Sequence, residues 1–334
     1  MKKSTKIYTL VLLLTQIILI ALNAAPSLAA IEPDVVYLYR LSTFEGPVSV
    51  GTWSKVRIDS ETNEVYVVSQ DDVRIFNTTG METFEFSSSL DEELNNETIA
   101  DVFVKKNGDM IFLTNSYRDG QTLYSLVLAN YRGEPISRIT LKNLPPDLSR
   151  FVPNSMRSHN GLLYFANLVG MQVLVVDEQG VYKNHYDIAK MIKRASDDEN
   201  DYSTMDVDDM FIGDFSVDSG GSILFTLPIY GSAFKLTPDQ HLIRIGVRGG
   251  GAGKFSIPGS IMEDTHGNYL VTDTLRCVVL VFDKKGKFIS EFGNRGYGGP
   301  GLIAPRGMAI DSADRLYISQ SSIFGVSVFQ LSYN

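Results

Sequence analysis

The feature that most constrains the fold of this 334-residue chain is a turn and strand that recur six times. Each copy begins with a tight turn rich in Asn, Asp and Gly, and the turns are centred on Asn63, Asn107, Asn160, Gly220, Gly267 and Asp314. Each turn leads into a short apolar strand, and these strands are Val65–Ser69, Met110–Thr114, Leu162–Ala166, Ile223–Leu227, Tyr269–Asp273 and Leu316–Gln320. Successive turns are about 44 to 60 residues apart, a spacing typical of the blades of a β-propeller.

The fifth copy shows the whole repeat unit, which runs from Phe255 to Phe292. It contains four short runs rich in Val, Ile, Phe and Tyr, which are Ser260–Glu263, Asn268–Thr272, Val278–Phe282 and Phe288–Phe292. Such runs, bounded by Gly or Asp, are typical of short antiparallel strands. Six successive four-stranded units predict an all-β fold, a six-bladed β-propeller. An eight-stranded barrel is the alternative, but it does not explain the repeat period.

The two ends of the chain are expected to share the last blade. After Arg315 the sequence supplies only two apolar runs, Leu316–Gln320 and Val326–Leu331, so the sixth unit lacks its fourth strand. The run Val35–Leu41 precedes the first full unit and can supply that strand. This arrangement closes the ring and removes an exposed sheet edge that would favour aggregation.

The N-terminus has the pattern of a secretory signal peptide. Three lysines precede an apolar run, Ile7–Leu22, and small residues follow it, with Ser27–Ala29 fitting a cleavage site before Ala30. The alternative is a retained membrane anchor, although the run is shorter than the ~20 residues of a spanning helix. We therefore predict a signal peptide over residues 1–29 and one propeller over residues 30–334. The product is expected to be exported to the periplasm or beyond the cell.

Charge and cysteine content narrow the class of protein. Residues of the hydrophobic types make up 44% of the chain, enough to form a large core and to exclude general disorder. The single cysteine, Cys277, excludes an internal disulfide framework and is expected in the core. The formal net charge of −9 disfavours nucleic acid, whose binding requires a field of Lys and Arg. It favours a basic partner instead.

The last two units resemble the NHL-repeat family. Gly249–Phe292 carries that family's pattern of a Gly-rich lead, Phe or Leu, Pro, an apolar strand ending in Asp, a Gly turn and a closing Val-x-Val-Phe, at Phe255, Pro258, Asp264, Gly267, Asp273 and Phe282. Gly296–Phe329 repeats the pattern at Leu302, Pro305, Asp311 and Val326–Phe329. The first four units match only in strands and turns. The resemblance implies an exported bacterial six-bladed NHL-type propeller, a group whose activity is generally unassigned.

Polar residues recur at the end of the second strand in five of the six units. These residues are Gln70, Asn115, Asn167, Asp273 and Gln320, and Pro228 takes the sixth position. Because the positions are equivalent, we expect the side chains to ring one face of the propeller. Two interpretations remain open: a shared ligand-binding ring, or separate caps of strand ends and turns.

A second set of candidates lies at the starts of the first strands, near the expected central channel. The aligned starts are Lys55, Asp101, Asn154, Asp214, Ser260 and Gly307, and Arg306 comes one position earlier. Further along these strands, Arg157 and Glu263 align with apolar residues of the other units. Because isolated charges are costly in an apolar register, they are expected to line the channel. The alternative is an alignment error of one residue.

No sequence pattern identifies catalytic residues, so catalysis is only an alternative hypothesis. The chain is similar in topology to gluconolactonase-type and strictosidine-synthase-type propellers, and this similarity implies an ion such as Ca²⁺ held by oxygen ligands near the channel. Asp101, Asn154, Asn167, Asp214 and Asp273 would be the oxygen donors here. A zinc lyase of the amidating type would need convergent histidines, but His159, His185, His241 and His266 fall in turns or after a strand.

An insertion at about residues 187–209 separates the third and fourth units. Asp187–Arg194 has apolar residues at helical spacing, with an acidic residue first and basic residues last, and predicts a short amphipathic helix. The stretch Ser196–Asp209 is rich in Asp and has three interpretations: a solvated loop, a Ca²⁺-binding loop or an acidic docking surface.

Taken together, the sequence predicts a noncatalytic exported propeller that binds a protein or polymer of the cell envelope through one face. A monomeric domain with no required cofactor is expected, and Ca²⁺ is the cofactor of the alternative hypothesis. That alternative is a metal-assisted hydrolase or lactonase, acting at a polar ring at the channel mouth.

Overall fold

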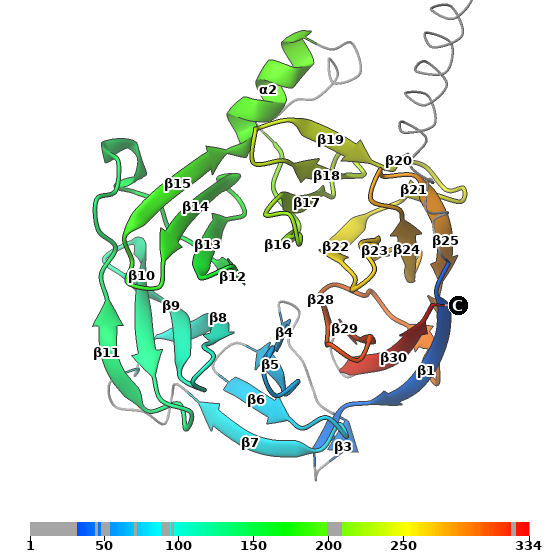
Figure 1. The fold of residues 1–334 in the computed structure, drawn as a ribbon, viewed down its shortest axis with the longest axis horizontal. Coiled ribbons are helices and arrows are strands. Elements are labelled where there is room, and N and C mark those ends of the chain that lie inside the picture. The colour runs from blue at the N-terminus through cyan, green and yellow to red at the C-terminus, as the bar shows by residue number, and fades with distance from the viewer. Residues whose placement is uncertain are drawn as a thin grey trace, which may run out of the picture. The chain divides into compact units, whose positions relative to one another are not determined.

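Six four-stranded antiparallel sheets surround a central axis (Figure 1). The computed structural model describes residues 32–43, 46–47, 54–69, 72–87, 94, 97–198, 209–321 and 325–333. All of them belong to one unit, Glu32–Asn334. The prediction of a six-bladed β-propeller is confirmed. The signal peptide predicted over residues 1–29 lies outside the described residues.

Blades 1 to 5 each run in chain order from the innermost strand to the outermost strand. Blade 1 consists of β4 (Lys55–Ile58), β5 (Val65–Ser69), β6 (Asp72–Phe76) and β7 (Glu82–Ser87). Blade 2 consists of β8 (Thr98–Val104), β9 (Met110–Arg118), β10 (Gln121–Ala129) and β11 (Pro135–Ile139). Blade 3 consists of β12 (Ser155–His159), β13 (Leu162–Asn167), β14 (Gln172–Asp177) and β15 (Tyr182–Asp187).

Blade 4 consists of β16 (Phe215–Val217), β17 (Ile223–Leu227), β18 (Ser232–Leu236) and β19 (Leu242–Ile245). Blade 5 consists of β22 (Pro258–Glu263), β23 (Tyr269–Asp273), β24 (Val278–Phe282) and β25 (Phe288–Phe292). Two-stranded pairs lie outside the blades, and they are β2 (Ser42–Thr43) with β3 (Gly46–Pro47), β20 (Val247–Arg248) with β21 (Lys254–Phe255), and β26 (Asn294–Arg295) with β27 (Gly301–Leu302). A short 3-10 helix, η2 (Pro146–Leu148), precedes blade 3.

Blade 6 is closed by the N-terminal strand, as predicted. It consists of β28 (Met308–Ile310), β29 (Arg315–Ser319), β30 (Val326–Ser332) and β1 (Asp34–Arg40). In the antiparallel pairing of β1 with β30, Tyr37 lies opposite Phe329 and their rings meet edge to face. The N-terminal strand therefore covers the edge of β30 and joins both ends of the described chain in one sheet.

The core lies between the blades, because each four-stranded sheet has two apolar faces. Six clusters of buried side chains each combine residues of two neighbouring blades. The cluster between blades 6 and 1, for example, contains Tyr317 and Val328 from one and Val67 and Phe76 from the other. Cys277 is buried between blades 5 and 6, as its sequence context predicts.

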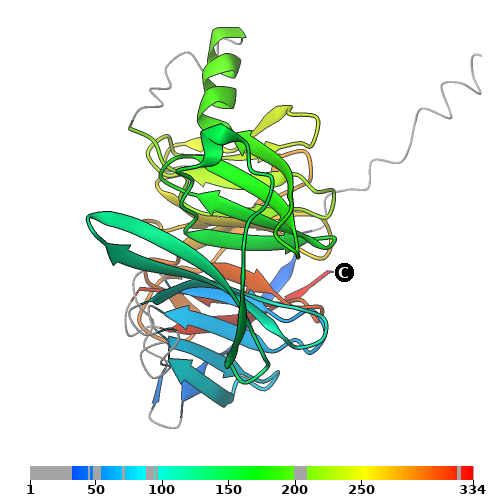
Figure 2. The same cartoon turned by 90° about the vertical axis from the view of Figure 1, so that its left-hand side faces the viewer.

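Two features depart from the regular ring. The hairpin of β9 and β10 has nine residues in each strand and projects beyond the neighbouring blades (Figure 2). The helix α2 (Ile188–Asp198) stands outside the ring after β15, where a helix was predicted over Asp187–Arg194. Its Ile188 and Ile192 side chains are fully buried against blades 3 and 4. Most of the acidic stretch that follows, residues 199–208, lies outside the described residues.

Among the described residues, no helix combines the length and the apolar character needed to cross a membrane.

Candidate functional site

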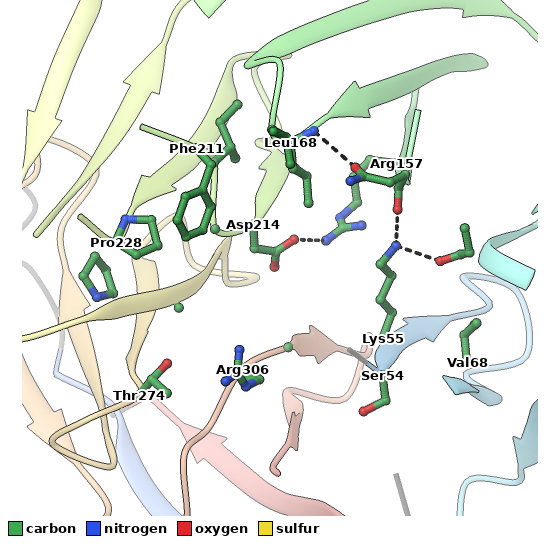
Figure 3. A pocket seen from close by; sticks show the side chains of 18 of the residues that line it. Ser54, Lys55, Val68, Arg157, Leu168, Phe211, Asp214, Pro228, Thr274 and Arg306 are labelled. Atoms are coloured by element: carbon green, nitrogen blue, oxygen red, sulfur yellow. Dashed lines mark hydrogen bonds and ion pairs between the residues drawn. The ribbon is translucent and has the colours of Figure 1, made fainter. Parts of the chain in front are cut away.

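A pocket of about 860 Å³ lies where the first strands of the blades begin. Blades 1 and 2 contribute Ser54, Lys55, Arg57, Val68, Thr98, Ile99 and Ala100. Blade 3, blade 4 and the segments before them contribute Asn154, Arg157, Leu168, Val169, Phe211, Ile212, Gly213, Asp214 and Pro228. Blades 5 and 6 contribute Ile257, Pro258, Gly259, Thr274, Arg306 and Gly307. All six blades therefore line one pocket at the channel mouth (Figure 3).

A belt of hydroxyl groups holds the strand starts around this pocket. Thr226 Oγ1 accepts a hydrogen bond from the Asp214 amide at 3.2 Å and donates one to the Gly259 carbonyl of the next blade at 2.6 Å. Thr272 makes the equivalent bridge from blade 5 to blade 6, with its hydroxyl 2.7 Å from the Ser260 amide and 3.4 Å from the Arg306 carbonyl. We call Thr226, Thr272 and their counterpart Ser319 the hydroxyl belt.

Glycine precedes each of these bridges for a steric reason. A Cβ on Gly259 would lie 2.6 Å from Thr272 Oγ1, and a Cβ on Gly307 would lie 2.8 Å from Ser319 Oγ. Because these approaches are closer than nonbonded contact permits, only glycine lets the first strand reach the belt.

A buried carboxylate lies behind the basic residues that line the pocket. Asp101 is fully buried, and its Oδ2 lies 2.7 Å from Arg57 Nη2, 3.5 Å from Lys55 Nζ and 3.7 Å from Arg157 Nη1. The Met156 amide also donates to Oδ2, at 2.8 Å. Burial by itself would raise the pKa of Asp101, but the three cations hold that pKa well below its usual range. Asp101 is therefore an ionised anchor that joins blades 1, 2 and 3.

A second ion pair joins blade 3 to blade 4. Arg157 Nη2 donates to Asp214 Oδ1 at 2.8 Å, and the Ser260 hydroxyl of blade 5 donates to Asp214 Oδ2 at 2.5 Å. The Arg157 guanidinium also lies 5.1 Å from the centre of the Phe215 ring, a cation–π contact. Burial and Arg57 lower the pKa of Arg157, but a guanidinium remains charged throughout the physiological range.

Lys55 is held by main-chain carbonyl groups. Its ammonium group donates to Ala100 O at 2.7 Å and also to Asn154 O (Figure 3). The pKa of Lys55 is lowered to about 8. Burial is the main cause, Arg57 and Arg157 add to it, and Asp101 opposes it. Lys55 is thus mostly protonated at neutral pH but close to its titration range.

The charge of the pocket is opposite to that of the chain. Lys55, Arg57, Arg157 and Arg306 line it, whereas Asp214 is the one acidic residue in the lining among the residues that the structure describes, and Asp101 lies buried behind the cations. Positive side chains therefore exceed negative ones here, although the chain carries a formal net charge of −9. The overall charge favoured a basic partner, but the pocket favours an anionic group.

The structure brings together seven of the residues predicted from the starts and interiors of the first strands. Six of them line the pocket, namely Lys55, Asn154, Arg157, Asp214, Arg306 and Gly307, and Asp101 supports it from behind. The Asn154 side chain accepts a hydrogen bond from the Leu168 amide at 3.2 Å.

Among the described residues, the polar side chains predicted at the ends of the second strands do not line the pocket, although Pro228 at the sixth position does. Asp273 accepts hydrogen bonds from four main-chain amides, those of Ser256, Ile257, Leu275 and Arg276. Gln320 accepts one from the Ile303 amide and donates to Ser327, and Asn167 accepts one from the Gly170 amide. Asn115 lies in β9, where its main-chain carbonyl accepts from Thr98. Gln70 lies outside the described residues. In Asp273, Gln320 and Asn167 the polar groups therefore act as caps of turns and loops.

Glu263 and Arg157 are not structurally equivalent, so the alignment that paired them is wrong. Arg157 pairs with Tyr164 inside blade 3 and reaches the pocket. Glu263 pairs with Tyr269 beside the turn at the other end of blade 5, where it accepts a hydrogen bond from the Ser219 amide at 2.5 Å. The two-residue Asn160–Gly161 turn is shorter than the corresponding turn of blade 5, and this difference shifted the alignment.

Arg57 is a pocket residue that the sequence reasoning did not select. The signal in the sequence that could have indicated it is a basic residue between the apolar residues Val56 and Ile58 of a four-residue strand. It was not used because a single charge in a short strand does not reveal its partner, Asp101, in the next blade.

The oxygen donors present do not fit a calcium ion, which takes about six to eight oxygen ligands. The carboxylates of Asp101 and Asp214 are bound by arginine, and the side chains of Asn167 and Asp273 bind main-chain amides away from the pocket. No histidine lines the pocket. Among the described residues, no three side chains of His, Cys, Asp or Glu are grouped in a way that could hold a metal ion.

Comparisons with known proteins agree with the fold. A family model described as a 6-bladed β-propeller matches residues 255–333, which include blade 5 and the C-terminal strands of blade 6. No curated protein matches the chain by sequence.

Solved structures resemble the propeller over most of its length. An auxiliary nutrient binding protein from Bacteroides ovatus is 13% identical, with a TM-score of 0.60, over 90% of this chain and 78% of that one. One from Bacteroides thetaiotaomicron is 12% identical, also with a TM-score of 0.60, over 90% and 77%. A catalytically inactive virginiamycin B lyase from Staphylococcus aureus is 10% identical, with a TM-score of 0.53, over 90% and 100%. At these identities the likeness establishes the propeller fold alone.

Proposed function

We propose that this chain is a noncatalytic binding propeller that holds a ligand, or the end group of a polymer, in the pocket at the channel mouth. The observation that carries the proposal is that both carboxylates of the pocket region are paired with arginine. Asp101 is bound by Arg57, and Asp214 is bound by Arg157 and Ser260. A carboxylate held between cations is a weak general base, so the arrangement suits recognition better than proton transfer.

The similarity to auxiliary nutrient binding proteins supports a binding role, since those proteins share the propeller over most of this chain. The lyase fold shows that the same scaffold also carries enzymes. What favours binding here is the pairing of charges in this pocket rather than the fold.

We further propose that the protein acts outside the cytoplasm, in the cell envelope. Support comes from the lysines, the apolar run Ile7–Leu22 and the small residues up to Ala29 in the sequence. The NHL-type pattern in blades 5 and 6 is part of the same proposal. Mass measurement of the N-terminus of the exported protein tests it, and a start at Ala30 is the expected result.

The binding proposal is tested by filling the pocket. Thr98 is exposed and lines the pocket, so Thr98→Trp places a large ring inside it. Thr83 is exposed on the outermost strand of blade 1, and Thr83→Trp is the matched control. In a thermal-shift screen of envelope metabolites, ligands that raise the Tm of the wild type are expected to act on the control but not on Thr98→Trp.

Two results would contradict the proposal. If Thr98→Trp binds every ligand as tightly as the wild type, the pocket is not the binding site. If a bound ligand is converted to a product by the wild type, and conversion is lost in Thr98→Trp, the protein is an enzyme.

A further inference from the structure

The two sides of the pocket differ in chemistry. The basic side carries Lys55, Arg57 and Arg157, and Arg306 lies below them in the close-up view (Figure 3). Phe211 and Pro228 lie on the opposite side, across Asp214. A ligand that fills the pocket therefore touches charged groups at one end and apolar groups at the other.

The basic side has an excess of hydrogen-bond donors. Asp101 is fully buried and accepts from Arg57, Ser155 and the Met156 amide, so its own hydrogen-bonding capacity is largely used inside the protein. Arg57 Nε is buried with no hydrogen-bond partner among the described residues. Arginine donors in a partly desolvated site bind planar oxyanions strongly, often through two parallel hydrogen bonds.

The apolar side is unusually exposed. Val169, Phe211 and Ile257, from the segments around blades 3, 4 and 5, keep 73%, 37% and 40% of their surface accessible. When an apolar ligand displaces water from side chains of this size, the free energy of binding becomes more favourable. Their place beside the basic groups links the two kinds of recognition in one site.

We propose that the pocket binds an anionic amphiphile, a molecule with one oxyanion head and an apolar body. The head contacts Arg306, Lys55 and Arg157, and the body lies against Val169, Phe211 and Ile257. Asp214 disfavours a head placed beside it, so the head lies toward Lys55 and Arg306. The volume of about 860 Å³ accommodates a ligand of ordinary small-molecule size. This inference rests on the proposed binding function and names the class of ligand.

The proposal is tested by calorimetric titration of the full chain with probes that separate head from body. Decanoate carries both parts, acetate and inorganic phosphate carry only a head, and decanol carries only a body. Decanoate is expected to bind at least about 10-fold more tightly than each of the others, because one charge-assisted contact is worth about a factor of ten. Its affinity is expected to fall with added salt, whereas that of decanol is not.

Two variants with matched controls locate the head and the body. Arg306→Gln is expected to weaken decanoate binding about 10-fold and to reduce its dependence on salt, since Lys55 and Arg157 remain. Arg118→Gln, an exposed change in β9, is its control. Val169→Asn is expected to weaken decanoate binding about three- to ten-fold, and Val36→Asn on the exposed side of β1 is its control.

The alternative outcomes are distinct. Equal affinity for decanol and decanoate would overturn recognition of the anion, and equal affinity for phosphate and decanoate would overturn recognition of the body. Binding to vesicles of phosphatidylglycerol without binding to monomeric decanoate would show a membrane surface site instead. If a neutral or cationic ligand binds and is lost in Thr98→Trp, this inference fails while the binding function stands. If no ligand binds in the pocket, both fail.

Discussion

The two ends of the innermost strands satisfy their polar groups in different ways. At the turn end, the same local solution recurs from blade to blade. Asp218, Asp264 and Asp311 each accept hydrogen bonds from the amides two and four residues later, all between 2.8 and 3.0 Å. Each carboxylate therefore stabilises its own turn, and among the described residues its contact with the next blade is at most a tyrosine hydroxyl, from Tyr269 to Asp218 and from Tyr333 to Asp264.

At the mouth end, the charged groups are not repeated and bind across blades. Asp101 of blade 2 binds Arg57 of blade 1 and the Met156 amide of blade 3. Asp214 of blade 4 is shared between Arg157 of blade 3 and Ser260 of blade 5. The contrast teaches that a repeated, local polar group serves folding, while a polar group that occurs once and crosses blades marks the site.

The largest expected effect is the loss of the Asp101 carboxylate. Asp101→Ala leaves Lys55, Arg57 and Arg157 close together without their shared anion, and should lower the free energy of unfolding by about 3–5 kcal/mol. Urea unfolding followed by circular dichroism measures the change. A loss no greater than that for Asp264→Ala would break the comparison between the two ends.

The hydroxyl belt predicts the next effect. Gly259→Ala brings a Cβ to 2.6 Å from Thr272 Oγ1 and should cost about 1–3 kcal/mol. Gly250→Ala is the control, since no atom lies within 4 Å of a Cβ at that position. Thermal unfolding compares the two variants, and equal Tm values would show that the belt tolerates displacement.

A turn carboxylate should affect stability alone. Asp264→Ala removes the acceptor of the His266 and Asn268 amides and of the Tyr333 hydroxyl, and should cost about 1–3 kcal/mol in urea unfolding. Because Asp264 lies at the turn end of the strands and the pocket lies at the mouth end, ligand affinity should stay within about two-fold of that of the wild type. A larger drop in affinity would mean that the ends are coupled.

The last expected effect concerns pH and is similar in size to the preceding one. The pKa of Lys55 is about 8 in the folded protein and about 10.4 when unfolded. Between these values the unfolded chain binds more protons, so stability should rise, by roughly 2 kcal/mol from pH 8 to 10. Lys55→Met should reduce this rise. Measurements should stop at pH 10, because burial raises the pKa of Tyr66, and ionisation of unfolded tyrosines then opposes folding.

These results show why the sequence predicts the fold more completely than the site. The repeated turns and strands specified the blade number, and the missing strand after Val326 specified closure by the N-terminal strand. The blade number follows from the repeat period, and the closure follows from the need to pair the free edge of the last sheet. The aligned first-strand starts also found Asn154 and Asp214, because equivalent positions in a closed ring must converge on its axis.

The remaining site residues depended on contacts between blades. Asp273 and Arg157 both lie close to the mouth, but Asp273 turns toward local amides while Arg157 reaches the pocket. Periodicity specifies the position of a residue and leaves the direction of its side chain open. The direction of the Arg57 side chain is decided by Asp101, which lies in another blade. The number of residues between the two does not follow from the repeat.

The hydroxyl belt has a consequence for how such a protein can change. In blades 4 to 6, neighbouring strand starts are joined by hydroxyl and main-chain groups. In blades 1 to 3 the basic side chains that line the pocket also join the blades, through Asp101 and Asp214. Each blade supplies its own small share of the lining. Substitutions in the share of blades 5 and 6 can therefore change the ligand while the ring stays intact, whereas substitutions of the basic residues in blades 1 and 3 change the ligand and the ring together.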